Sequence, residues 1–160
     1  DLERRGEPYR LDLPLGIMVE TPAAALCADT LAIEADFFSI GTNDLTQYVL
    51  AVDRGNSHVE KLYTTLHPSV LWAIRMAVEA AQCAGIPVAV CGESASDPMA
   101  LPILIGLGVD ELSVSSRSLL STRGTVRSLS FAEWSGRIPE IMSLSTAEEA
   151  KSYLLDHLHS

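Results

Sequence analysis

The amino-acid sequence predicts a parallel α/β fold that makes up about half of a (β/α)8 TIM-type barrel. Apolar segments typical of buried strands alternate four times with helical patterns, which indicates a parallel sheet connected by helices. The connections are short and no dinucleotide-type glycine fingerprint is present, which favours a barrel over a doubly wound sheet. A complete barrel takes about 250 residues, whereas this chain has 160. We therefore expect four βα units whose open sheet edges need a missing half, or an association, to cover them.

The composition is typical of a globular domain, with 48% hydrophobic and 20% charged residues. A net charge of −10 argues against nucleic acid or an anionic membrane as a partner, because both select clustered lysine and arginine. The sequence has no signal peptide at its start and no apolar run of the roughly 20 residues that span a bilayer, so we expect a cytoplasmic protein without membrane insertion. The three cysteines show no metal-ligand spacing and predict neither a disulfide framework nor a zinc site.

The first unit follows a charged stretch, residues 1–14, that we interpret as a helix end and a loop. Leu15–Val19 is a short apolar strand that ends at Glu20. Thr21 is the expected N-cap of a helix over residues 22–35, which has proline at its first position.

The second unit is the one around which the fold is organised. Phe37–Ile40 is an apolar strand, and the following glycine and threonine interrupt it. Asn43 or Asp44 is expected to cap a helix over Leu45–Ala51, whose first backbone N–H groups face any bound anion. A plain helix cap is the alternative interpretation of these two residues.

The third and fourth units have the same form. An amphipathic helix is predicted from Pro68 to the glycine at position 85, and the strand Pro87–Val90 follows it. Asp97 and the proline after it are expected to open a short helix before the last strand, Glu111–Ser115. We assign residues 15–130 to the half barrel.

Two further helices are predicted towards the C-terminus. One covers Leu119–Leu129, and the other covers Thr146–His159 with Ser145 and Glu148 as its capping box. Residues 131–160 are expected to form a terminal helical segment. Cys27 and Cys83 lie in alanine-rich helical runs and are interpreted as small core residues.

If the strands are neighbours, their carboxyl ends bring polar residues to one mouth: Glu20, Asn43, Asp44, Cys91 with Glu93, and Ser115 with Ser116. Glu20 and Asp44 can share a Mg²⁺ ion, which accepts one or two carboxylates and completes its octahedron with water and substrate oxygens. The alternative is that both residues only cap helices.

Arg54 and Cys91 are the other candidates at this mouth. The Arg54 guanidinium can hold a phosphate or carboxylate in two parallel hydrogen bonds, unless it is a solvated arginine paired with Asp53. Cys91 ends a strand, so it is either a buried structural thiol or a general acid or base at the mouth.

Several motifs in Leu15–Ser116 resemble the phosphoenolpyruvate-utilising enzymes, and within them the Enzyme I group of the bacterial sugar phosphotransferase system. The motifs are GIMVETPAA from Gly16, DFFSIGTNDLTQY from Asp36, AVDRGN from Ala51, VCGE from Val90 and GLGVDELS from Gly106. The resemblance implies that this chain is the second half of a barrel that binds phosphoenolpyruvate (PEP). The segment after Ser115 departs from the family pattern.

The resemblance also implies roles for single residues. Glu20 and Asp44 match the Mg²⁺ ligands, Asn43 and Arg54 match groups that hold the PEP phosphate and carboxylate, and Cys91 matches the proton donor to the pyruvate enolate. The family's phosphorylated histidine and its other arginines lie upstream and are absent from this chain.

The implied function is transfer of the PEP phosphoryl group to that histidine and on to the histidine-containing phosphocarrier protein. The resemblance implies a homodimer for the intact protein and no independent activity for this fragment. The alternatives are the barrel of a multiphosphoryl transfer protein, a PEP synthase or pyruvate phosphate dikinase relative, or a non-catalytic assembly module.

Overall fold

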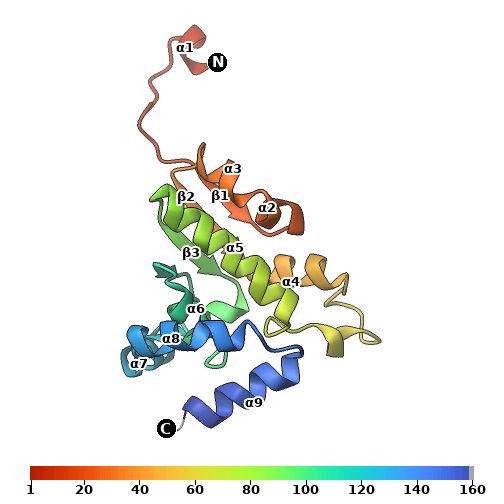
Figure 1. Ribbon diagram of the computed structural model, residues 1–160. Helices are drawn as coiled ribbons and strands as arrows, with labels where there is room; N and C mark the ends of the chain where they lie inside the picture. Colours follow the sequence, from red (N-terminus) through yellow and green to blue (C-terminus); the bar gives the residue numbers. More distant parts are fainter. Residues whose placement is uncertain (159–160) are drawn as a thin grey trace.

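A computed structural model of the chain describes residues 1–158 and shows one parallel sheet with helices on one of its faces (Figure 1). Residues 1–14 contain α1 (Leu2–Arg5) and extend away from the sheet. The strands are β1 (Gly16–Val19), β2 (Phe37–Gly41), β3 (Val88–Cys91) and β4 (Glu111–Leu112). The remaining helices are α2 (Pro22–Leu26), α3 (Ala28–Ala32), α4 (Thr42–Leu50), η1 (Glu60–Leu62), α5 (Pro68–Ala84), η2 (Glu93–Ser96), α6 (Leu101–Leu107), α7 (Leu119–Ser128), α8 (Phe131–Ile141) and α9 (Ala147–Leu158).

The four strands pair in sequence order, and every pair is parallel. Met18 is level with Ser39, and Gly41 is level with Cys91, so the carboxyl ends of β1, β2 and β3 meet at one edge. The predicted parallel α/β arrangement is confirmed. Closure of the sheet into a barrel stays a prediction.

The two faces of the sheet differ because strand side chains alternate in direction. One face forms the first core: Val19, Phe38, Ile40, Val88 and Val90 are buried there against α2–α5. Met18, Phe37, Ser39 and Cys91 alternate with these residues, and 46% of Met18 and 36% of Phe37 is exposed. The second face is therefore uncovered.

A second core joins α6, α8 and α9 to the start of α5. Its fully or nearly buried members include Ile103, Trp134, Ile138 and Leu154. Gly106 permits close packing there, since a Cβ atom on it would lie 2.7 Å from the Trp134 carbonyl oxygen.

The predicted helix boundaries were correct where a cap fixes them. Thr21 accepts a hydrogen bond from Ala24 N–H, with proline at the first helical position. Gly85 ends α5 in the left-handed conformation, at φ 70°. The single predicted helix over residues 22–35 was wrong, because the chain breaks at Cys27 into α2 and α3.

The predicted cap of α4 was also wrong. The helix begins at Thr42, its N-cap is Gly41, and Asn43 and Asp44 lie inside its first turn. At the start of this helix, buried Thr42 donates a hydrogen bond from Oγ1 to the Cys91 carbonyl oxygen, 2.8 Å away, which connects α4 to the end of β3.

Other boundaries moved by a few residues. α6 begins at Leu101, because Asp97 accepts a hydrogen bond from Met99 N–H and forms a turn of its own. β4 is two residues long instead of five. The capping box of α9 is Thr146 with Glu149, one residue later than predicted. The helix end predicted at His159 lies outside the described residues.

Cys27 and Cys83 are exposed, so their interpretation as core residues was wrong. Each lies on the outer side of its helical segment, whereas the alanines beside them, such as Ala25 and Ala81, fill the core.

Candidate functional site at the carboxyl edge of the sheet

The first turn of α4 and the end of β3 are joined through Asn43. The Asn43 Oδ1 atom accepts a hydrogen bond from Glu93 N–H at 3.0 Å. Gly92 makes this approach possible, because its φ is 95° and a Cβ atom there would lie 2.9 Å from Asn43 Oδ1. The two segments therefore hold the Asn43 side chain in one orientation.

A buried hydroxyl pair supports the same junction. Thr42 Oγ1 donates to the Cys91 carbonyl oxygen and accepts from Ser94 Oγ at 2.6 Å. Both hydroxyl residues are almost completely buried. Since a buried polar network costs free energy unless its members are paired, this one fixes α4 and η2 relative to β3.

Cys91 is half-buried. Its Sγ atom accepts a hydrogen bond from Ser39 Oγ at 3.6 Å. It also lies 3.5 Å from the Ile40 carbonyl oxygen and 3.8 Å from Met18 Sδ. Because Met18 and Ser39 belong to the uncovered face of the sheet, the thiol is on that side.

Glu20 and Asp44 lie at the ends of neighbouring strands. The Glu20 side chain rests against Gly41, with Oε2 3.1 Å from the place where a Cβ atom on Gly41 would be. Asp44 lies three residues after Gly41, in the first turn of α4. Within residues 1–158, no three His, Cys, Asp or Glu side chains gather into a metal-binding group. Glu20 and Asp44 offer two carboxylates. This number suits Mg²⁺, which binds one or two protein carboxylates and keeps several of its water ligands.

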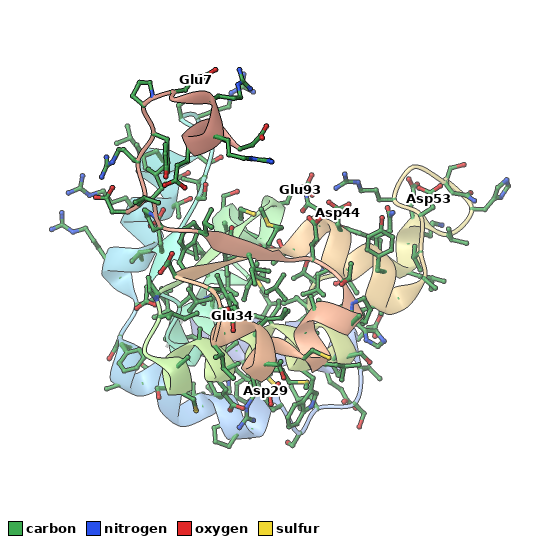
Figure 2. All side chains as sticks on the ribbon, turned by 90° about the horizontal axis from the view of Figure 1, so that it is seen from above. Glu7, Asp29, Glu34, Asp44, Asp53 and Glu93 are labelled. Carbon is green, nitrogen blue, oxygen red and sulfur yellow. The ribbon has the colours of Figure 1, made fainter. Side chains whose placement is uncertain are left out.

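Arg54 pairs with Asp44 and not with Asp53. The Arg54 Nη2 and Asp44 Oδ1 atoms are 3.9 Å apart, and the two side chains are 49% and 42% exposed. Asp53 instead accepts a hydrogen bond from Gly55 N–H. Figure 2 shows Asp44 and Glu93 at the same end of the sheet, with Asp53 farther out on the loop. Arg54 therefore adds a positive charge beside the carboxylates.

Tyr63 lies beside Asn43, although no pattern in the sequence selects it. Its hydroxyl donates a hydrogen bond to the Asn43 carbonyl oxygen at 2.9 Å. Burial raises the pKa of Tyr63 above its usual value, Arg54 lowers this pKa, and the carboxylates of Glu93 and Asp44 raise it. Tyr63 lies in a loop with no helix or strand pattern, so periodicity provides no signal for it.

A cavity of about 530 Å³ lies between the ends of β3 and β4 and η2. Asn43, Cys91, Glu93 and Ser115 line it. Of the residues selected from the sequence, the structure thus brings Asn43, Cys91, Glu93 and Ser115 to one cavity. It places Glu20, Asp44 and Arg54 at the same edge of the sheet, outside that lining.

Comparison with known proteins identifies the family. Residues 1–131 match the profile described as PEP-utilising enzyme, PEP-binding domain. The chain belongs to this family of PEP-utilising enzymes. The family's PEP-binding domain thus covers the sheet, α2–α7 and every candidate residue discussed above.

Curated members of the family share more than 40% of their residues with this chain. The phosphoenolpyruvate-protein phosphotransferase of Priestia megaterium is 44% identical over 158 residues, which is 99% of this chain and 28% of the relative. That of Bacillus subtilis (strain 168) is 44% identical over 96% of this chain and 27% of the relative. That of Geobacillus stearothermophilus is 47% identical over 96% and 26%. The chain thus spans about a quarter of the relatives' length.

No helix in residues 1–158 is both long enough and apolar enough to cross a membrane.

Proposed function

We propose that this chain is the PEP-binding part of a phosphoenolpyruvate-protein phosphotransferase. One observation carries the proposal: four kinds of functional group lie at one edge of the parallel sheet. They are the Asn43 amide, the Asp44 and Glu93 carboxylates, the Arg54 guanidinium and the Cys91 thiol. Ligands bind at this edge in parallel α/β folds. The family and the names of the relatives supply the substrate.

In this proposal, the first turn of α4 and Arg54 bind the anionic substrate. The N-cap of α4 is glycine without a side-chain cap, so the first N–H groups of the helix are free to face an anion. Asn43 Oδ1 already accepts from Glu93, which leaves the Asn43 amide N–H groups for phosphate oxygens. Arg54 holds a phosphate or the carboxylate in charge-assisted hydrogen bonds.

Glu20 and Asp44 are the residues that would hold Mg²⁺. When bound, the ion neutralises phosphate charge as the phosphoryl group leaves. The two carboxylates alone would repel the substrate, and Arg54 beside Asp44 offsets part of that charge.

Cys91 is proposed to protonate the enolate of pyruvate that remains after phosphoryl transfer. The S–H bond breaks as a C–H bond forms at the former methylene carbon, and a thiolate remains. Ser39, which donates to Sγ at 3.6 Å, stabilises that thiolate.

The uncovered sheet face supports the second-half-barrel interpretation. Met18 and Phe37 are apolar and partly exposed on the side of the sheet that a closed barrel would bury. We propose that residues 15–130 form the half barrel, that residues 131–160 form the terminal helical segment, and that the other half lies upstream in the longer protein. In that cytoplasmic, homodimeric protein, the phosphoryl group would pass to a histidine on a separate domain and then to the histidine-containing phosphocarrier protein.

Isothermal titration of the chain with PEP, with and without Mg²⁺, tests the proposal. We expect Mg²⁺-dependent binding that Asp44→Asn weakens by about tenfold, because a charged metal ligand is lost. Asp53→Asn is the matched control, since Asp53 lies outside the mouth and its Oδ1 atom only accepts from Gly55 N–H. Binding that is identical with and without Mg²⁺ would contradict the metal assignment. A folded chain that binds no PEP would contradict a site in this half alone.

A further inference from the structure

The loop that carries Arg54 forms most of its hydrogen bonds within itself, such as Gly55 N–H to Asp53 Oδ1 and His58 N–H to Asn56 Oδ1. Residues 53–58 are all exposed. The Arg54 guanidinium has a 3.9 Å ion pair with Asp44, and its main-chain N–H has a 3.4 Å hydrogen bond to Gln47 Oε1. Ion pairs between half-exposed side chains have little strength. These contacts are too weak to hold Arg54 at the mouth of the site.

Tyr63 supplies a stronger connection farther along the same loop. Its hydroxyl donates to the Asn43 carbonyl oxygen at 2.9 Å, and its side chain is half-buried. Asn43 belongs to the first turn of α4, immediately before Asp44. The hydrogen bond thus connects the arginine loop to the turn that presents both candidate ligand-binding residues.

The Tyr63 hydroxyl also lies near the charges of the mouth. Burial raises the pKa of Tyr63 most, the Arg54 guanidinium lowers this pKa, and the carboxylates of Glu93 and Asp44 raise it. The hydrogen bond to the Asn43 carbonyl oxygen therefore closes the loop onto the helix turn among these charged groups.

We propose that Tyr63 is a positioning residue: its hydrogen bond to the Asn43 carbonyl oxygen closes the loop onto the first turn of α4 and so holds Arg54 beside Asn43 and Asp44. This inference rests on the proposed function only for the identity of the ligand. The placement of the loop can be measured without any ligand.

The test compares Tyr63→Phe with Tyr48→Phe in the 160-residue chain. Phenylalanine keeps the ring and removes only the hydroxyl. Tyr48 is the matched control, because it is a tyrosine of α4 whose side chain is 53% exposed. The first readout is limited trypsin digestion at the bond between Arg54 and Gly55.

We expect Tyr63→Phe to speed cleavage after Arg54 by about three- to tenfold, which corresponds to the loss of one hydrogen bond. Cleavage after Arg75 and Arg137, which lie inside α5 and α8, should not change. A loss of overall stability would instead speed cleavage at all three sites. Equal cleavage rates at Arg54 in Tyr63→Phe and wild type would overturn the proposal.

The second readout is Mg²⁺-dependent PEP affinity in a double-mutant cycle of Tyr63→Phe with Arg54→Gln. If Tyr63 acts through Arg54, Tyr63→Phe weakens binding in the wild-type background and has almost no effect once Arg54 is replaced. Additive losses would overturn the positioning role. Faster cleavage after Arg54 in a chain that binds no PEP would leave Tyr63 as the loop anchor and count against the proposed function.

Discussion

Asn43 Oδ1 and Glu93 N–H are joined by a 3.0 Å hydrogen bond between the ends of β2 and β3. This bond fixes which side of the amide faces the mouth. With its oxygen bonded to Glu93 N–H, the Asn43 amide has its two N–H donors left for a ligand, which suits an anion.

Asn43→Asp separates this structural role from ligand binding. The carboxylate still accepts from Glu93 N–H and still fits beside Gly92, whereas the donor is lost and a negative charge is added. We expect the unfolding temperature to stay within a few degrees and PEP affinity to fall by about tenfold or more. Asn43→Ala, which loses both roles, is the comparison for thermal unfolding and titration. Unchanged PEP affinity in Asn43→Asp would remove Asn43 from the substrate site.

Gly92→Ala should destabilise the chain by about 1–3 kcal/mol, because the residue would sit at φ 95° with its Cβ atom 2.7 Å from Thr42 Oγ1. The measurement is urea unfolding followed by circular dichroism. Gly124→Ala is the matched control. Gly124 lies in α7, and no atom comes within 4 Å of the position that a Cβ atom would take there, so alanine should be neutral or stabilising by up to about 1 kcal/mol. Equal effects of the two substitutions would contradict the close packing at Gly92.

Cys91→Ala should spare PEP binding and slow protonation of the enolate. The experiment needs a protein that joins this chain to its upstream half. It measures solvent deuterium incorporated into the methyl group of pyruvate, alongside PEP affinity. Cys27→Ala is the control, because that thiol is exposed and lies on the helical side of the sheet. Equal loss of binding and protonation in Cys91→Ala would indicate a structural thiol.

The contact of α9 with α8 should weaken at alkaline pH. Burial raises the pKa of Tyr153 above its usual value, and its hydrogen bond to Glu140 Oε2, at 2.8 Å, raises it further. A tyrosine with a raised pKa in the folded state contributes stability that is fully present below about pH 10 and is lost as the pH rises through the folded-state pKa. Thermal unfolding of Tyr153→Phe should show a smaller decrease above about pH 10 than wild type. Parallel decreases in both proteins would exclude Tyr153 as the cause.

The sequence predicted the order of the fold well, since each signal was local. Thr21 and Gly85 mark helix ends by their own side-chain and backbone chemistry, and the apolar runs mark the strands. The early start of α4 coincides with a contact between distant segments. Thr42 Oγ1 donates to the carbonyl oxygen of Cys91, 49 residues away, which no local pattern encodes.

In the candidate site, too, residues marked by local sequence patterns could be predicted, and residues placed by contacts between distant segments could not. Cys91 and Glu93 could be placed at the mouth from strand ends alone, and the structure brings them together with Asn43. Tyr63 could not be placed there from the sequence, because it contacts Asn43 of α4 from an irregular loop, 20 residues further along the chain. The alternative interpretation of Arg54, a pair with Asp53, is not what the structure has: Asp53 is adjacent in sequence, but its side chain accepts a hydrogen bond from Gly55 N–H.

The two separate cores have a consequence for amide hydrogen exchange. Helices α8 and α9 are held by the second core, whereas α4 and the strands belong to the first. Pro139 lies inside α8 and cannot donate a backbone hydrogen bond, which lowers the cost of opening that helix. The amides of α8 and α9 should therefore exchange as one cooperative unit while those around Asn43 and Cys91 stay protected. We therefore expect residues 131–158 to open and close without disturbing the geometry at the mouth.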